Sequence, residues 1–185
     1  RLYGCPQTLF KFHPDYDDVL IDILARDPAG TLVLHAGRTQ MWKTALLRRL
    51  EAKSAGISKR IHWLGNMPRE AYIQTLAACS VMLDPFPFGG GNTTLEALAV
   101  GTPVVTMPPR FARGRLAYAF CRRLDWSDGI AQSPSEYAEI AVRLAKNPAP
   151  ASAAIRAGSP RLFRNAEGVS QLADVLESAY RAPKD

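Results

Sequence analysis

The amino-acid sequence predicts a doubly wound α/β domain built on a mostly parallel, Rossmann-like sheet. Short apolar runs typical of buried strands alternate with segments of helical periodicity, and this alternation continues along most of the chain. The 185 residues, 47% of them hydrophobic and 22% charged, are enough for a globular domain with a full core. We expect the sheet domain to occupy residues 1–146, and residues 147–185 to form a linker and a C-terminal helical segment.

The first half of the chain begins with the end of a strand at residues 2–4. Pro14 suits the first turn of a helix, where Asp15 and Asp17 lie at the positive end of the helix dipole. The continuous apolar run at residues 31–36 is typical of a buried parallel strand. The same alternation predicts, in order, a helix around residues 42–50, a strand at 60–65, a helix at 68–79 and a strand at 81–84.

The second half starts with a glycine-rich loop at residues 88–92 and ends with an amphipathic helix. The elements expected between them are a helix at 93–100, a strand at 104–106, a helix at 113–124, a short strand at 129–131 and a helix at 134–144. Pro-Ala-Pro and Ala-Gly-Ser-Pro sequences predict an irregular linker within residues 147–160. The apolar residues of the last helix are expected to pack back on the sheet or on something outside this chain.

Charge and cysteine content narrow the functional class. The formal charge of +6 comes from scattered cations without interleaved aromatic residues, which favours an ordinary surface or an anionic small ligand over nucleic acid. Three dispersed cysteines without C-x-x-C spacing argue against disulfides and zinc, and favour a reducing, cytoplasmic location. The apolar runs fall far short of the ~20 residues of a membrane helix, so we expect no membrane span.

The most informative stretch is residues 84–98, which follow a predicted strand. Its glycines, among them Gly90 and Gly91, let the backbone approach a ligand closely. The helix that follows presents unpaired N–H groups to an anion, and Asn92 adds a side-chain donor at the same place. No Gly-Lys-Ser/Thr follows the glycines, and the spacing differs from the dinucleotide fingerprint, so this is neither a Walker loop nor a dinucleotide-binding loop.

Three further side chains of this stretch have two interpretations each. Thr93 and Thr94 add hydroxyl donors for an anion, although either could simply cap the helix. Glu96 lies where a carboxylate can accept hydrogen bonds from vicinal hydroxyls such as those of ribose, although it could merely favour the helix N-terminus.

Residues 84–108 as a whole resemble the nucleotide-sugar segment of the O-GlcNAc transferase family, glycosyltransferase family 41, in its bacterial forms. Soluble bacterial N-glycosyltransferases of the same larger family share the Pro-Phe-Pro-Phe-Gly sequence found here at residues 85–89. The resemblance runs from about residue 3 to residue 144, with a weaker echo at 161–163. It implies one lobe of a GT-B enzyme, in which two Rossmann-like lobes face each other and the carboxyl lobe binds the UDP-sugar.

The resemblance also implies roles for single residues. Phe-Lys-Phe-His-Pro at residues 10–14 is similar to the family's lysine motif, which implies that Lys11 contacts the diphosphate and neutralises the leaving group as the catalytic residue. Gln7 or Thr8 lies near a position that meets the nucleotide. Tyr72 falls where the family places an aromatic or histidine over the base, and Arg115 aligns with a family arginine. Each could be structural instead: Lys11 on the surface, Tyr72 in the core, Arg115 paired with a carboxylate.

The glycine-rich stretch carries the remaining implied contacts. Thr93 and Thr94 match paired threonines at the diphosphate, and Gly90 and Gly91 belong to the same site. Asn92 stands where many members have histidine, and Glu96 replaces the usual ribose-binding carboxylate with a shift of one residue.

The implied function is inverting transfer of GlcNAc, or alternatively glucose, from a UDP-sugar to a protein or peptide acceptor, with no metal and no cofactor. The length suits one lobe, so we expect the amino lobe, and upstream helical repeats, to belong to the same polypeptide, and the chain alone to be inactive. Two alternatives remain open: a retaining GT-B sugar transferase, whose broad motif residues 96–105 also resemble, and a non-catalytic nucleotide-binding module.

Overall fold

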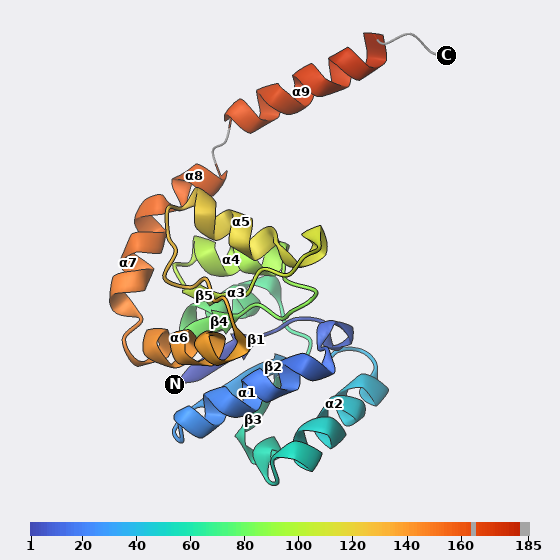
Figure 1. The fold of residues 1–185 in the computed structure, drawn as a ribbon, viewed down its shortest axis with the longest axis vertical. Helices are drawn as coiled ribbons and strands as arrows, with labels where there is room; N and C mark the ends of the chain where they lie inside the picture. Colours follow the sequence, from blue (N-terminus) through green and yellow to red (C-terminus); the bar gives the residue numbers. More distant parts are fainter. Residues whose placement is uncertain (164–165, 182–185) are drawn as a thin grey trace.

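The computed structural model describes residues 1–163 and 166–181 and is centred on a five-stranded parallel sheet (Figure 1). The strands, which run in the spatial order β3-β2-β1-β4-β5, are β1 (Leu2–Cys5), β2 (Thr31–His35), β3 (Ile61–Leu64), β4 (Val81–Leu83) and β5 (Val104–Val105). The predicted doubly wound α/β fold is therefore confirmed.

Helices connect the strands and continue beyond them. They are α1 (Pro14–Arg26), α2 (Gln40–Lys53), α3 (Arg69–Ala78), α4 (Asn92–Ala99), α5 (Leu116–Arg123), α6 (Pro134–Lys146), α7 (Ala149–Gly158), α8 (Pro160–Phe163) and α9 (Ala166–Arg181), with single 3₁₀ turns η1 (Leu9–Lys11), η2 (Ile57–Arg60) and η3 (Ala112–Gly114). Helix α1 packs against α2 and α6, whereas α3 packs against α4. Right-handed crossovers place these two groups on opposite faces of the sheet.

The strand order reverses between β1 and β4. The chain moves outward from β1 through β2 to β3, then returns so that Tyr3 of β1 pairs with Leu32 on one side and Val81 on the other. The loops that follow β1 and β4 therefore start side by side and run in opposite directions along the sheet. Such a switch point opens a crevice at the carboxyl edge of the sheet, where ligands of doubly wound folds bind.

Three aromatic rings close the core beneath this edge. Tyr16 of α1 lies edge-on to Phe86, with ring centroids 5.2 Å apart, and Tyr137 of α6 lies edge-on to Tyr16 at 6.0 Å. The Tyr137 hydroxyl donates to the backbone oxygens of Asp84, at 3.1 Å, and Val105, at 3.0 Å. Helix α6 is thus fixed to the carboxyl ends of β4 and β5, which steadies the loops that leave them.

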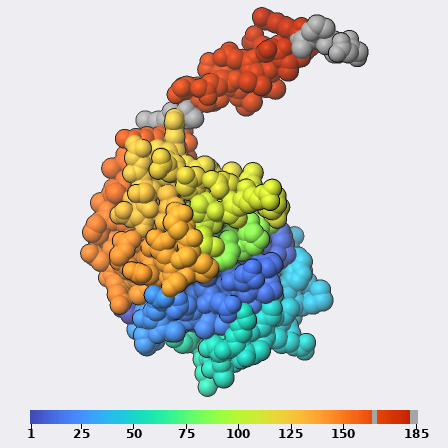
Figure 2. All heavy atoms as spheres, in the orientation of Figure 1, coloured from blue at the N-terminus to red at the C-terminus, as the bar shows by residue number. Residues whose placement is uncertain are grey.

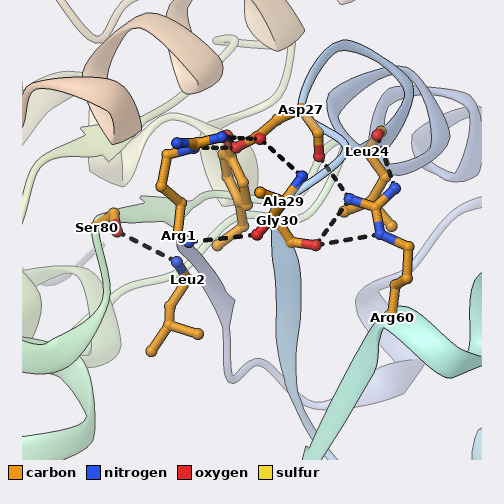
Figure 3. A network of polar contacts seen from close by, with 9 residues as sticks. Arg1, Leu2, Leu24, Asp27, Ala29, Gly30, Arg60 and Ser80 are labelled. Carbon is orange, nitrogen blue, oxygen red and sulfur yellow. Dashed lines mark hydrogen bonds and ion pairs between the residues drawn. The ribbon is translucent and has the colours of Figure 1, made fainter.

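The opposite, amino edge of the sheet is joined by a polar network around Asp27 (Figure 3). The Arg1 guanidinium pairs with the buried Asp27 carboxylate, which also accepts from the Tyr3 hydroxyl at 2.6 Å. From the other side, Arg60 donates to the backbone oxygens of Asp27, at 2.5 Å, and Gly30, at 2.8 Å. Since Arg1, Gly30 and Arg60 directly precede β1, β2 and β3, the network ties the starts of these three strands together.

Three predicted elements need correction. Residues 147–160 are not an irregular linker, because α7 spans most of them and buries Ala151 and Ile155; Pro148 and Pro150 lie at its start, where proline fits. The helix predicted at 113–124 is interrupted: a β-carbon at Gly114 would meet the Pro87 oxygen at 2.5 Å, and the chain there forms η3 before α5 begins. At 129–131 only the single bridge Thr106–Ile130 forms.

The predicted last amphipathic helix forms as α9 but does not pack back on the sheet. It extends away from the domain, as Figures 1 and 2 show. Its large apolar side chains are at least 60% exposed: Val169, Leu172, Val175, Leu176 and Tyr180. No helix in the described part of the chain is long and apolar enough to cross a membrane.

Candidate functional site

A cleft of about 610 Å³ opens at the carboxyl edge of the sheet, beside the switch point. Its walls come from the loops after β1, β2 and β3 and from the starts of α3 and α4. The lining residues are Pro6, Thr8, His35, Arg38, Asn66, Met67, Arg69, Tyr72 and Glu96. The lining is mixed, with cationic, aromatic and carboxylate side chains together, which suits a polar ligand with an anionic part.

Lys11 lies beside the glycine-rich loop although 78 residues separate the two in sequence. Its Nζ donates to the Gly89 oxygen at 3.0 Å and to Gln7 Oε1 at 2.9 Å, and lies 4.7 Å from the Phe88 ring centroid. A backbone bridge between Phe12 and Pro87 holds the two segments together. Burial lowers the pKa of Lys11, and the charge of Asp84 opposes this change.

Asp84, which directly follows β4, holds the glycine-rich loop in place. Its buried carboxylate accepts from the Gly90 N–H at 2.6 Å and from the Thr106 hydroxyl at 2.8 Å. A β-carbon at Gly89 would lie 2.9 Å from both carboxylate oxygens, so glycine is required for this close approach. Burial raises the pKa of Asp84 to about 7, against the effects of the two hydrogen bonds and of Lys11.

Gly90 joins the lysine side of the site to the threonine side. A β-carbon there would meet Thr94 Oγ1 at 2.5 Å and Gln7 Nε2 at 2.6 Å. Thr94 and Gln7 are both buried, and Lys11 is bonded to Gln7. The structure therefore brings Lys11, Gln7, Gly90 and Thr94 into one contiguous cluster at the start of α4, where the first N–H groups have no partners within the helix.

The start of α4 also faces the cleft. Tyr72 of α3 is half-buried and lines the cleft; burial raises its pKa, and a side-chain hydrogen bond with Thr93 opposes the rise. Tyr72 is thus neither solvent-exposed nor part of the closed core. Glu96 lines the same cleft and pairs with Arg69 at 3.0 Å, which leaves its carboxylate partly neutralised.

Asn92 and Arg115 lie outside this cleft lining. Asn92, the first residue of α4, lines a neighbouring groove of about 380 Å³, and Gly91 packs against Leu116. Arg115 donates to the Pro109 oxygen at 2.8 Å and lies over the Tyr118 ring, 5.0 Å from its centroid. The Arg115 side chain therefore has two protein partners, the Pro109 oxygen and the Tyr118 ring.

Sequence reasoning missed several residues of the site. Asp84 drew no attention as a functional group, and Arg38, Asn66 and His35 of the cleft wall were not predicted. His35 Nδ1 accepts a hydrogen bond from the Gly37 N–H at 2.9 Å, which fixes the orientation of the His35 ring at the end of β2. The available signal was positional, since each lies at or just after the carboxyl end of a predicted strand. Within the described residues, no cluster of three or more His, Cys, Asp or Glu side chains could hold a metal ion.

The model of the family described as "Glycosyl transferase family 41" matches residues 2–168, which is most of the chain and includes every residue of the cleft. The chain belongs to glycosyltransferase family 41. The family match therefore extends well beyond residues 84–108 and covers the whole sheet domain.

Curated relatives and solved structures agree with this assignment. The chain is 29% identical over 140 residues to a UDP-N-acetylglucosamine–peptide N-acetylglucosaminyltransferase of Caenorhabditis elegans, and 32% identical over 150 residues to a UDP-glucose:protein N-β-glucosyltransferase of Actinobacillus pleuropneumoniae. These matches cover 74% and 78% of this chain but only 12% and 23% of the relatives. The chain therefore spans less than a quarter of either relative.

Among solved structures, a mutant O-GlcNAc transferase from Thermobaculum terrenum superposes with a TM-score of 0.80 at 28% identity. The match covers 97% of this chain and 35% of that one. An Anabaena protein solved with UDP and glucose matches with a TM-score of 0.63 at 20% identity, over 96% of this chain and 48% of that one, which shows the shared fold. The fold is that of one lobe of a GT-B glycosyltransferase.

Proposed function

We propose that this chain is the UDP-sugar-binding lobe of a protein glycosyltransferase that transfers GlcNAc or glucose with inversion and without a metal ion. The observation that carries the proposal is the cluster of Lys11, Gln7, Gly90 and Thr94 beside a polar cleft at the switch point. A full positive charge and the N-terminal N–H groups of α4 meet there, which is the environment that a diphosphate requires.

The proposed ligand extends from this cluster into the cleft. The diphosphate lies against Lys11, Thr93 and Thr94, where it replaces Gln7 and the Gly89 oxygen as the partner of the ammonium group. The ribose hydroxyls donate to Glu96, and the uracil ring lies against Tyr72. Names of relatives support both donor sugars, since one of them uses UDP-N-acetylglucosamine and another UDP-glucose.

The proposed reaction is a single displacement at the anomeric carbon. A hydroxyl or amide group of the acceptor forms the new bond and its proton leaves on the acceptor side, while the bond to the β-phosphate oxygen breaks and its electron pair goes to UDP. Negative charge grows on UDP in the transition state. Lys11 and the dipole of α4 are fixed toward that charge before the reaction, which is how an electrostatic catalyst lowers a barrier.

A binding experiment with two lysine variants tests the proposal. Titration calorimetry compares UDP-GlcNAc, UDP-glucose and uridine on the wild-type chain, Lys11→Met and Lys43→Met. Lys43 is the matched control, because it is also half-buried and lies over a ring at 4.7 Å, but that ring is Trp63 of β3, whereas the ring beside Lys11 is Phe88 of the glycine-rich loop. We expect Lys11→Met to weaken both UDP-sugars by about tenfold or more and uridine little, since a charge-assisted bond is lost only with the diphosphate.

Other results would contradict the proposal. Equal losses for UDP-sugars and uridine in Lys11→Met would remove Lys11 from the diphosphate. Loss of UDP-sugar affinity on addition of EDTA would show that a metal ion takes part. In the full-length enzyme, Lys11→Met should lower kcat as well as affinity, because the charge that Lys11 meets is greatest in the transition state.

A further inference from the structure

Asp84 is a buried acid at the centre of the candidate site, and no cation touches it. Its two carboxylate oxygens have one hydrogen-bond donor each, the Gly90 N–H and the Thr106 hydroxyl, and both donors are neutral. Lys11 interacts with Asp84 only through its charge, because the Lys11 Nζ is hydrogen-bonded to the Gly89 oxygen and to Gln7 instead. A charge buried with neutral partners alone is costly, because the protein replaces little of the solvation that it loses.

The other titratable groups that face Asp84 come from three elements and are neutral at physiological pH. They are Cys5 of β1, Cys121 of α5 and Tyr137 of α6, each with a pKa that burial raises. Tyr16 of α1, which contacts Tyr137, also has a raised pKa. Lys11, at the end of η1, is thus the cation whose charge stabilises the ionised form of Asp84.

Asp84 and a bound diphosphate would compete for that cation. The Gly90 N–H that Asp84 holds lies in the same turn as Gly89, whose carbonyl oxygen holds Lys11. A diphosphate that pairs with the Lys11 ammonium neutralises the positive charge that stabilises ionised Asp84. It also brings its own negative charge close to Asp84, separated from it by the turn at residues 89–90. Both changes act in the same direction, toward the protonated carboxyl.

We propose that Asp84 is a positioning residue that fixes the turn at residues 89–90 and takes up a proton when the diphosphate of a nucleotide sugar binds. The proton comes from solvent and adds to one carboxylate oxygen. The Thr106 hydroxyl then turns to accept from the new O–H, while the Gly90 N–H keeps the other oxygen. The turn is preserved while its negative charge is removed. This inference rests on the proposed function, because it requires the diphosphate at Lys11.

The direction of the pH dependence follows from linkage. Free Asp84 has a pKa of about 7, and the bound diphosphate raises that value further, so the complex holds more protons than the free protein near pH 7.5. Affinity for the UDP-sugar therefore falls as the pH rises from 6.5 to 8.5. If the diphosphate raises the pKa of Asp84 by about one unit, the dissociation constant increases roughly sixfold over this range, and about half a proton is taken up per ligand at pH 7.5.

The test is proton counting by titration calorimetry of the 185-residue chain with UDP-GlcNAc, in two buffers of different ionisation enthalpy at pH 7.5. UDP-GlcNAc is the suitable probe because both its phosphates are esterified, whereas the terminal phosphate of UDP titrates near pH 6. We expect about half a proton of uptake for the wild type, none with uridine, and none in Asp84→Asn. The asparagine variant imitates the protonated acid, since it keeps an oxygen for Gly90 and offers an N–H to Thr106.

A second measurement keeps the proposal testable if Asp84→Asn does not fold. Carboxyl ¹³C NMR of the wild type follows Asp84 directly, and its titration midpoint should rise on addition of UDP-GlcNAc but not of uridine. Uptake that persists in a folded Asp84→Asn variant would assign the proton to another group and overturn the proposal, as would an unchanged NMR midpoint. In both cases UDP-GlcNAc still binds, so the proposed function survives. No binding of UDP-GlcNAc at any pH would overturn both.

Discussion

One buried aspartate lies at each edge of the sheet, and the two have opposite pKa shifts because their hydrogen-bond partners differ. At the amino edge, Asp27 is paired with the Arg1 guanidinium, and this bond, with help from Tyr3, holds the pKa of Asp27 well below its usual range. At the carboxyl edge, Asp84 has neutral donors only, and burial raises its pKa to about 7. Asp27 is therefore ionised with its charge matched, whereas Asp84 is close to half-protonated at neutral pH.

The difference separates stability from function in this domain. Asp27 lies away from the cleft and favours the folded state at every pH above its unfolded pKa. Ionised Asp84 disfavours the folded state, yet it lies under the loop where we place the diphosphate. Local features that cost stability are most common at functional sites. The following changes test that contrast.

The largest loss of stability is expected from Asp27→Asn at the amino edge. It leaves the Arg1 guanidinium without its carboxylate, and breaking such a pair typically costs about 3 kcal/mol, although partial exposure of Arg1 reduces this figure. Urea denaturation at pH 7 measures the change, and UDP-GlcNAc affinity should be unaltered. A loss of affinity comparable to the loss of stability would mean that the two edges are not separate.

Asp84→Asn should have the opposite sign in stability. The raised pKa of Asp84 means that the native state holds its proton up to about pH 7, whereas the unfolded chain loses it near pH 4. The free energy of unfolding contributed by Asp84 is therefore greatest below pH 4 and falls as the pH rises toward 7. Asp84→Asn should remove this decline, so its stability relative to the wild type should be greater at pH 8 than at pH 4 by roughly 4 kcal/mol, since the two pKa values differ by about three units. Parallel pH profiles for the two proteins would contradict the contrast.

A matched pair of glycine substitutions extends the comparison to sterics. In Gly30→Ala the new β-carbon would meet the Tyr3 ring at 2.6 Å, and in Gly90→Ala it would meet Thr94 and Gln7 at similar distances. Overpacking of this kind typically costs about 1–3 kcal/mol in either case. Only Gly90→Ala should also weaken UDP-GlcNAc, by about tenfold, because it displaces Gln7 and Thr94. Denaturation and calorimetry on both variants measure the two losses, and weakened binding in Gly30→Ala would count against the assignment of the site.

The smallest effects come from the hydroxyl donors of the two acids. Tyr3→Phe removes a bond to Asp27 and should cost about 1 kcal/mol of stability without moving the pH profile near neutrality. Thr106→Val removes a bond to Asp84, so it should raise the pKa of Asp84 and shift the stability profile toward higher pH. Denaturation between pH 4 and pH 9 distinguishes the two variants. A shift for Tyr3→Phe of the same size would show that both networks titrate alike.

The elements at the sheet could be predicted because each depends on a local pattern. The apolar run of β2 and the Pro14 start of α1 are properties of a few consecutive residues, and the meeting of Lys11 with the glycine-rich loop follows from parallel topology. The irregular linker predicted within residues 147–160 was wrong, because the structure there depends on packing and not on the local sequence. Two prolines suggested a break, whereas burial of Ala151 and Ile155 against the domain makes them the first turn of a helix.

The candidate site was predicted unevenly. Gln7, Lys11, Gly90 and Thr94 were named from the chain and lie together, whereas Arg115 is held by Pro109 and Tyr118. Asp84 was missed because nothing in its neighbourhood in sequence shows that Gly90 and Thr106 are its donors and that no cation reaches it. Asp84 lacks a cationic partner because of how its own segment, the glycine-rich loop and the Thr106 segment meet in space. No short stretch of the sequence shows that arrangement.

Helix α9 and the sheet domain should differ in their rates of amide hydrogen exchange. Its side chains stand clear of the sheet domain, so its 16 residues are stabilised by their own backbone and by surface pairs such as Arg181 with Glu177 at 3.0 Å. Isolated helices of about this length are marginal in water. Its amide protons should therefore exchange almost as fast as those of an unfolded peptide, while those of β1 exchange only when the whole domain unfolds. Proteolysis within α9 should accordingly leave the thermal transition of the sheet domain unchanged.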